Sequence, residues 1–402
     1  MSERSGESGQ RARRPSRPRS RALVGLLVVV ATTTVAVGTH ALGSLGSGAT
    51  GTRSAVRLDP PARSVTVVAG GDVLTEERVR FHAARYGALS GRRFDFDPMF
   101  APVAPILRGA DLAICNMEIP VGVPGGPYGY AGRSPYGGNL LLAPYEIAPG
   151  LRTAGFDRCS TATNHAFDLG VAGIGSTIEA LGAHGIGASG TARTRAESVP
   201  PIFVVDGVRI AHVSYTTASN TVAPADAWRL NLTRSSTKMS SAVQDARRRG
   251  AQIVLLSLHV SVELQPGPTW ADRALVDAVV RTSDVDAVFV HGPHVVQPVE
   301  MVRGTPVWWS LGNFVSEMGP PSTGRYADPK TSDGVLAHVR FSETVDGDFA
   351  AHPDTIAICN DVVDRTVRSA TAGLADPNLP SRVHDELRAC LARTRALVPS
   401  AR

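Results

Sequence analysis

The chain has 402 residues, enough to bury a sizeable hydrophobic core in one large α/β domain or in two or three smaller domains. Lys and Arg exceed Asp and Glu by five, and the first 21 residues account for this excess, since they hold seven arginines against Glu3 and Glu7. The rest of the chain is balanced in charge, which excludes nucleic-acid binding by the folded part as an explanation of the high isoelectric point.

An apolar run, Ala22–Leu42, follows the basic tail of residues 1–21. A positive segment before an apolar run is typical of an export signal, and the arginines are expected to stay on the cytoplasmic side. The run is long enough to span a bilayer and longer than most signal-peptide cores, which favours an uncleaved transmembrane signal-anchor. Small residues after the run leave a cleaved signal peptide open. Residues 43–63, rich in Gly, Ser and Thr, are expected to form a flexible linker.

These features predict a single-pass cell-membrane protein with an extracytoplasmic domain, or a secreted protein if the signal is cleaved. Export places the four cysteines in an oxidising compartment, where they can pair. Cys359 and Cys390 are the predicted bridge, because a terminal helix beginning near Ser381 carries Cys390 on its inward face. Cys115 and Cys159 lie in predicted core strands, where a second bridge and two buried free thiols are both compatible with the sequence.

Short apolar runs alternate with helical patterns from Ser64 onward, which predicts an α/β domain over residues 64–345 with a mostly parallel sheet. The predicted strands are Val65–Gly70, Leu112–Cys115, Cys159–Thr163, Ile253–Leu258 and Val285–Val290, and the clearest helices are Gly173–Leu181 and Ala271–Arg281. Further apolar segments predict a second or antiparallel portion of sheet: Val208–Ser214, Val307–Ser310 and Val335–Phe341. Residues 346–402 are expected to form a C-terminal extension whose last helix packs on the domain.

Pro and Gly crowd into Val121–Gly138, which is too long and irregular for a simple turn. A loop of this length inside a compact domain is usually functional or disordered. Its three tyrosines and Arg133 suit a wall of a substrate site, and a solvated insertion is the alternative. Pro320–Lys330 is a second loop of this kind.

Polar side chains follow the predicted strands at the points where the strands end. In open α/β sheets, functional groups gather at the carboxyl ends of the strands. Five strands of one predicted sheet each end in an oxygen or imidazole donor, and a later strand ends in an amide. The residues are Asp72, Asn116, Glu118, Asn164, His165, Asp168, His259, His291, His294 and Asn313. Each alone is compatible with a turn, a helix cap or a structural imidazole, but their recurrence at one edge predicts a shared site.

This donor set contains oxygen and imidazole groups without thiolates, which suits a divalent ion such as Mn²⁺, Fe²⁺ or Zn²⁺. Two ions could share a bridging carboxylate and hold a hydroxide between them. Coordination lowers the pKa of bound water towards ~7, so a nucleophile exists at neutral pH. One or two divalent ions are therefore the expected cofactor.

Five motifs resemble, in order, those of the CapA family, the poly-γ-glutamate capsule biosynthesis proteins. They are Gly71-Asp72-Val73, Asn116-Met117-Glu118, Thr163 to Gly170 (TNHAFDLG), His291-Gly292-Pro293-His294-Val295 and Ser310 to Phe314 (SLGNF). The resemblance covers most of the predicted domain, and the third and fifth motifs are the most specific. Such proteins are similar to the metallo-dependent phosphatases, so the resemblance implies a four-layer α/β/β/α sandwich with a metal site at the strand ends.

The resemblance also implies a role for each candidate residue. The implied metal ligands are Asp72, Glu118, Asn164, His259 and His294. The implied catalytic residues are His165, which contacts the substrate or protonates the leaving group, and His291, which lines the site. The supporting or substrate-binding candidates are Asn116, Asp168, Glu263, Asn313 and Arg133.

Two departures from the family pattern predict a second ion that is weakly bound or absent, and a phosphatase activity that is correspondingly low. Many metallophosphatases carry a His two places after the first Asp, where this chain has Leu74. The family often shows His-Trp-Gly-x-Glu-Tyr where this chain keeps His259 and Glu263 and lacks both aromatic residues.

The leading hypothesis is an extracytoplasmic, metal-dependent hydrolase or transferase that acts on an anionic cell-surface polymer such as poly-γ-glutamate. The expected partners are this polymer, the membrane through the N-terminal helix, and other membrane-bound proteins of polymer synthesis or export, with no nucleic acid. A non-catalytic module that binds or guides the polymer is an alternative on the same fold. A secreted phosphoesterase is a third hypothesis.

Overall fold

The computed structural model describes residues 62–402. The predicted basic tail, the apolar run and almost all of the predicted linker fall outside these residues. No helix within residues 62–402 is both long enough and apolar enough to cross a membrane.

The first of two large sheets contains the N-terminal strand β1 (Ser64–Val73) at its centre. Its parallel part runs from β1 through β2 (Leu112–Met117) and β5 (Arg158–Ser160) to β6 (Gly187–Ser189). On the other side of β1 lie the antiparallel strands β14 (Asp333–Glu343), β15 (Phe349–Asn360) and β16 (Val367–Ser369). The short strand β13 (Asn313–Val315) pairs in parallel with the end of β1.

The second sheet has a parallel core between two antiparallel edge strands. Its order is β11 (Val299–Val302), β12 (Thr305–Trp308), β10 (Ala287–His291), β9 (Ile253–His259), β8 (Val208–Thr216) and β7 (Ile202–Val205). The predicted strands of this region are therefore present. They do not belong to one sheet with β1, β2 and β5, so the expectation that the five strands share one sheet is wrong, whereas the two sheets of the implied sandwich are present.

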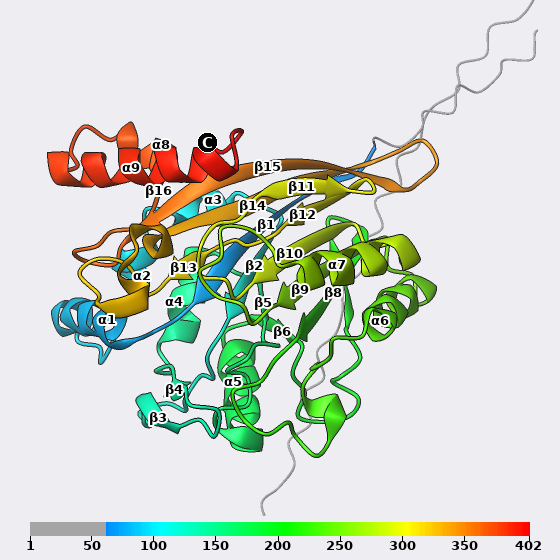
Figure 1. Cartoon of the computed structure of the whole chain (residues 1–402), viewed down its shortest axis with the longest axis horizontal. Coiled ribbons are helices and arrows are strands. Elements are labelled where there is room, and N and C mark those ends of the chain that lie inside the picture. The colour runs from blue at the N-terminus through cyan, green and yellow to red at the C-terminus, as the bar shows by residue number, and fades with distance from the viewer. Residues whose placement is uncertain (1–61) are drawn as a thin grey trace, which may run out of the picture. The chain divides into compact units, whose positions relative to one another are not determined.

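Helices cover the outer faces of both sheets (Figure 1). The first sheet carries α1 (Glu77–Ser90), α2 (Asp97–Phe100), α3 (Ala104–Arg108), α4 (Ile147–Ala154) and α5 (Gly170–Ala183). The second sheet carries α6 (Ser236–Arg248) and α7 (Trp270–Thr282). The other helices are α8 (Ala370–Leu374), α9 (Ser381–Leu397) and the 3₁₀ turns η1 (Ala227–Arg229), η2 (Gly324–Ala327) and η3 (Pro329–Ser332).

Alternating side chains of the central strands enter different cores, which places the two sheets face to face. On β1, Val67 points into the core between the sheets, whereas Val68 points towards the helices. On β9, Leu255 enters the same inner core, whereas Leu256 packs under the helices of the second sheet. A parallel strand buried on both faces reads as a continuous apolar run, which is why these strands are visible in the sequence. The mixed α/β fold is thus layered as helices, sheet, sheet and helices.

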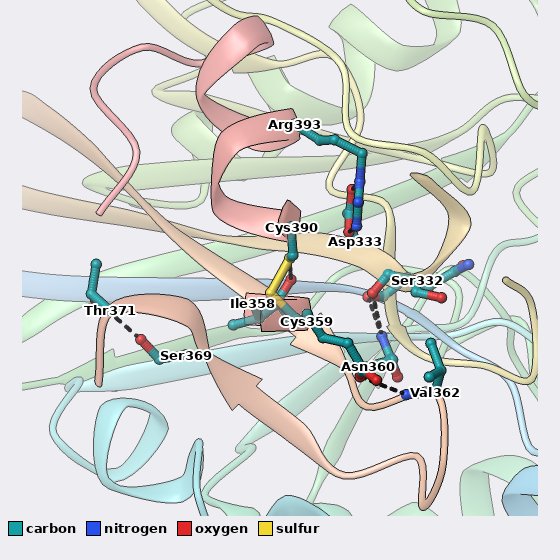
Figure 2. The surroundings of a disulfide bond; sticks show 12 residues. Ser332, Asp333, Ile358, Cys359, Asn360, Val362, Ser369, Thr371, Cys390 and Arg393 are labelled. Atoms are coloured by element: carbon teal, nitrogen blue, oxygen red, sulfur yellow. Dashed lines mark hydrogen bonds and ion pairs between the residues drawn. A yellow bond between two sulfur atoms is a disulfide. The ribbon is translucent and has the colours of Figure 1, made fainter. Parts of the chain in front are cut away.

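The C-terminal residues continue the first sheet. The boundary expected at 345/346 falls between β14 and β15, which pair from Asp333 opposite Cys359 to Glu343 opposite Phe349. Helix α9 packs on β15, and the predicted disulfide between Cys359 and Cys390 joins the two (Figure 2).

The second pair of cysteines is also bridged. Cys115 of β2 and Cys159 of β5 stand opposite each other in the sheet and form a disulfide, which resolves the alternatives that the sequence left open.

The long Gly- and Pro-rich segment, Val121–Gly138, contains the first strand and the turn of a hairpin, and the second strand directly follows it. Strands β3 (Gly129–Arg133) and β4 (Asn139–Leu142) pair with each other as a separate two-stranded sheet. This hairpin is not predictable from the sequence, because the segment lacks the alternation of apolar and polar residues that marks a strand.

Candidate metal centre

The ends of four parallel strands, two from each sheet, bring the candidate ligands together. Asp72 lies at the end of β1, Glu118 directly follows β2, His259 ends β9 and His291 ends β10. The loop after β10 adds His294, whose backbone has a positive φ of 58°. The predicted cluster of strand ends is therefore real, although it forms across two facing sheets.

Asp72, Glu118 and His294 form the centre of the cluster. All three are buried, and one potential ligand atom from each lies within 4.8 Å of the others. Nδ1 of His294 is 3.1 Å from Oδ2 of Asp72, and its Nε2 is 3.7 Å from Oε1 of Glu118. Two carboxylates and an imidazole at this spacing match the ligand types of Zn²⁺, Mn²⁺ and Fe²⁺ sites.

The carboxylate of Glu118 makes the strongest case for a cation. Neither of its oxygens has a hydrogen-bond partner within the described residues, and the side chain is 1% exposed. A buried carboxylate without a partner is costly and must bind a proton or a cation. Burial accordingly raises the pKa of Glu118 well above its ordinary value. These residues therefore fit a divalent ion.

Two further imidazoles face the same carboxylates. Nε2 of His259 is 3.9 Å from Oε1 of Glu118, and Nδ1 of His291 is 3.7 Å from Oδ1 of Asp72. Burial lowers the pKa of His259 to about 3 and that of His291 to about 4. Both rings are therefore neutral at physiological pH, which is the form that binds metal. Neither ring nitrogen of His291 has a hydrogen-bond partner in the part of the chain that the structure describes.

His294 has the opposite electrostatics. Burial opposes its charged form, but the carboxylates of Glu118 and Asp72 outweigh burial and raise its pKa to about 10. Likewise, burial opposes the charged form of Asp72, while the hydrogen bond and charge of His294 lower the pKa of Asp72 to about 2. Without a metal, the cluster thus favours an imidazolium on His294 against the carboxylate of Asp72.

Amide side chains orient the candidate ligands. Asn116 donates from Nδ2 to Oδ1 of Asp72 at 2.8 Å and accepts a hydrogen bond from the hydroxyl of Ser160. Oδ1 of Asn313 lies 3.0 Å from Nδ1 of His294. Such partners fix ring and carboxylate orientations in metal sites. Asn116 and Asn313 therefore lie where supporting residues are expected. Ser160, at the end of β5, also supports the cluster, although the prediction from the strand ends did not include it.

Gly292 allows the loop after β10 to approach the cluster. Its backbone N–H donates to Oδ2 of Asp72 at 3.2 Å, and its φ is 100°. A Cβ at this position would collide with the backbone oxygen of Val260 and lie 2.9 Å from Nε2 of His259. Only glycine fits both the positive φ and the close contact.

His165 and Asp168 form a separate pair beside the cluster. Nδ1 of His165 lies 2.6 Å from Oδ2 of Asp168, which also accepts a hydrogen bond from the N–H of Leu141 at 2.8 Å. Asp168 does not cap the following helix, since α5 begins without a side-chain cap. The carboxylate instead orients the imidazole, as in an acid–base pair.

Asn164 and His165 share a partner that sequence reasoning missed. Asn220 places Nδ2 3.2 Å from the ring nitrogens of His165, and its Oδ1 accepts a hydrogen bond from Asn164 at 3.3 Å. The Oδ1 of Asn164 is buried and has no partner within the described residues, which suits a ligand role. Among residues 62–402, no hydrogen bond or ion pair joins Asn164 or His165 directly to the central cluster. Asn220 follows β8 in an irregular segment that offers no sequence signal.

Glu263 and Arg133 have hydrogen-bond partners outside the central cluster. Glu263 pairs with Arg325 and accepts a hydrogen bond from the hydroxyl of Tyr326 at 2.7 Å. Arg133 is exposed on the hairpin, where Nη1 donates to Asn139 at 3.1 Å. Across the described chain, no hydrogen bond or ion pair joins either side chain to the three central residues.

A family model described as "Bacterial capsule synthesis protein PGA_cap" matches residues 66–318, which is more than half of the chain. The chain belongs to this family. The matched region contains every candidate ligand and both predicted catalytic histidines, and the resemblance to the CapA family is confirmed.

Two relatives from Bacillus are similar to this chain. "PGA biosynthesis protein CapA" of Bacillus subtilis is 26% identical over 259 residues, covering 64% of this chain and 64% of the relative. "Capsule biosynthesis protein CapA" of Bacillus anthracis is 27% identical over 288 residues, covering 70% and 65%. The chain thus spans slightly less than two thirds of the length of these relatives.

Among solved structures, the chain is similar to a calcineurin-like phosphoesterase, YfkN, of Bacillus subtilis, at 10% identity and a TM-score of 0.39, covering 83% of this chain and 98% of that chain. It is also similar to a 5'-nucleotidase precursor of Thermus thermophilus, at 12% identity and a TM-score of 0.39, covering 83% and 60%.

Proposed function

We propose that this protein is a metal-dependent hydrolase or transferase of capsule biosynthesis that acts on an anionic cell-surface polymer, with poly-γ-glutamate as the first candidate. The carboxylate of Glu118, buried beside Asp72 and His294 and without a hydrogen-bond partner in the described part of the chain, carries the proposal. Membership of the capsule synthesis family supports the polymer as the substrate.

Asp72, Glu118 and His294 would hold the first ion, with His259, His291 and Asn164 as further donors. A bound divalent ion supplies Lewis acidity and an ionised water at neutral pH. The chain itself contributes the orientation of the ligands by Asn116 and Asn313. His165, fixed by Asp168 at Nδ1, is placed to transfer a proton at its other ring nitrogen, Nε2.

The proposed location is outside the cytoplasmic membrane, tethered through residues 22–42 or released if the signal is cleaved. The two disulfides support this location, because such bonds persist in oxidising compartments. The membrane and other membrane-bound proteins of polymer synthesis or export are proposed partners.

A non-catalytic polymer-binding or export module is the second candidate. The observation that favours it is Leu74, which is buried where many metallophosphatases place a histidine ligand. A missing ligand weakens a second ion and with it a two-metal reaction.

The test uses the full-length chain purified in detergent, its metal content measured, and poly-γ-glutamate followed by chain length and free amine. We expect one or more bound divalent ions and a change in polymer length or end groups that EDTA abolishes and metal restores. Metal-loaded protein that leaves every polymer bond intact would refute the catalytic proposal. Polymer binding under the same conditions would then identify the binding module.

A further inference from the structure

Helix α1 and the turn after it carry an unusual concentration of arginine. Residues 78–93 contain five arginines and no acidic residue, although the chain beyond its N-terminal tail is balanced in charge. Arg92 pairs with Asp95 and Asp97. The side-chain nitrogens of the other four, Arg78, Arg80, Arg85 and Arg93, have no carboxylate within 4.0 Å in the described part of the chain. Because Nη1 of Arg78 is buried and its Nη2 donates to the backbone oxygen of Pro321 at 3.3 Å, we refer to Arg80, Arg85 and Arg93 as the arginine surface.

Tyr128 joins this surface to the β3–β4 hairpin. The guanidinium carbons of Arg80 and Arg93 lie 5.6 and 4.5 Å from the centre of its ring. Nη1 of Arg93 also donates to the backbone oxygen of Gly126 at 3.0 Å. These contacts fix the two arginines side by side without a neutralising carboxylate among the described residues, so their mutual repulsion is relieved by solvent or by an anion.

The hairpin in turn contacts the candidate site. The hydroxyl of Ser134 donates to the backbone oxygen of Asn220, and the N–H of Leu141 donates to Asp168 at 2.8 Å. Two more aromatic side chains of the hairpin, Tyr130 and Tyr136, are 64% and 68% exposed. The arginine surface, the hairpin and the loops around His165 are therefore linked by direct contacts, with α1 and the hairpin on one side of the molecule (Figure 1).

We propose that the arginine surface and the hairpin tyrosines bind a carboxylate-bearing polymer chain and direct it to the metal centre. Guanidinium groups pair with carboxylates through two parallel hydrogen bonds, and exposed aromatic rings give a flexible chain apolar surface to lie on. A run of arginines suits a repeating polyanion better than a single small anion, since the charges are spread along the helix.

The contacts between the hairpin and the site favour a polymer over an anionic membrane surface. A membrane would need only the exposed arginines, whereas the link through Ser134 and Asp168 ties the surface to the groups proposed to act on a substrate. The ligand's identity rests on the proposed function, but its binding is measurable whether or not the metal centre is catalytic.

The test compares two sets of three substitutions in the full-length protein in detergent, with end-labelled poly-γ-glutamate as the probe. The first set is Arg80→Gln, Arg85→Gln and Arg93→Gln. The control set, Arg195→Gln, Arg281→Gln and Arg340→Gln, removes the same charge from exposed positions elsewhere. Affinity is measured at several salt concentrations, with and without EDTA, and circular dichroism checks the fold of both variants.

We expect the first set to weaken polymer binding by about tenfold at low salt, because each exposed charge pair is weak and three are lost together. The salt dependence of binding should also become flatter, because fewer salt-screened charge pairs remain. The control set should bind within about twofold of the parent, and EDTA should not change binding by either protein. Arg85→Glu gives a second variant with little risk to the hairpin, because this side chain lies over the Phe81 ring, 5.9 Å from its centre, and it should also weaken binding.

Equal loss in both sets, or no loss in the first, would overturn this surface as the polymer site. Binding to phosphatidylglycerol vesicles that depends on these arginines, without binding to the polymer, would also overturn it. Arginine-dependent polymer binding without any turnover would keep this inference and refute the catalytic part of the proposed function.

Discussion

At the scale of single residues, charge balance around Glu118 determines what the centre can bind. Burial favours the protonated form of Glu118, whereas His294 keeps Asp72 ionised. A divalent ion would replace the proton on His294 and would stabilise the ionised form of Glu118. The same three side chains therefore form an ion-paired cluster without metal and become a ligand set once His294 loses its proton.

Replacing Glu118 with glutamine tests its role with little change in volume. A metal at about 100 times its Kd adds about 2.7 kcal/mol to the free energy of unfolding of a protein that binds it only when folded. We expect the parent to show this stabilisation and Glu118→Gln to lose it, measured by thermal unfolding with and without added Mn²⁺ or Zn²⁺. Glu197→Gln, the same chemical change at a surface ion pair with Arg193, should keep the metal response. An equal response in both variants would contradict the assignment.

His165 should separate binding from turnover. His165→Ala should keep the metal-induced stabilisation and lower the rate of polymer processing by about 10²–10⁴-fold, the usual contribution of a positioned acid or base. The measurement is turnover at saturating polymer beside metal content. Wild-type turnover in His165→Ala would show that the pair with Asp168 is structural.

The raised pKa values of His294 and Glu118 predict how metal affinity depends on pH. Between pH 6 and 8 His294 carries a proton in the metal-free protein, because its pKa is about 10, and burial shifts the pKa of Glu118 upward as well. Ligands must lose their protons to bind, so affinity should rise with pH, by about one log unit per pH unit for each proton released. Calorimetry in buffers of different ionisation enthalpy counts the protons, and a flat profile would contradict this electrostatic description.

At the scale of elements, the C-terminal helix depends on a covalent link to the sheet. The bridge between Cys359 and Cys390 closes a loop with a sequence separation of 31, and α9 is otherwise held by a small apolar cluster and by ion pairs of Arg393 with Asp333 and Arg382 with Asp361. Replacing both cysteines with alanine should lower the free energy of unfolding by about 3–4 kcal/mol in the chain-entropy model. Urea unfolding measures the change, and limited proteolysis should cut near α9 first. An unchanged midpoint in urea would show that the noncovalent contacts are enough to hold the helix.

Sequence patterns located individual elements better than their partners. The apolar runs that became β1, β2, β9 and β10 are visible because both faces of each strand are buried. The sequence does not predict the hairpin β3–β4, because glycine and proline residues interrupt the alternation of apolar and polar side chains that marks a strand. No pattern in the sequence says which strands pair. The sequence alone therefore does not separate β9 and β10 from the sheet that holds β1.

At the scale of the molecule, the candidate site was predictable because parallel strands expose their carboxyl ends at one edge, and two facing sheets keep that property. The prediction from strand ends therefore located Asp72, Glu118 and His294 although it assigned all five strands to one sheet. The same reasoning does not find Asn220, because the position of Asn220 depends on tertiary contacts of an irregular loop. Arg133 is a substrate-binding candidate only because it lies in the long loop, and the structure places it on the exposed hairpin.

The topology of the whole protein gives the last prediction. Residues 1–21 carry the whole excess of positive charge, and positive segments beside an apolar run are retained in the cytoplasm. The domain beyond residue 64 should then lie outside the membrane, where its two disulfides persist. Protease added to intact cells stripped of capsule should remove the domain while a cytoplasmic marker protein stays protected. A domain that is digested only after lysis would refute both the location and the proposed access to a surface polymer.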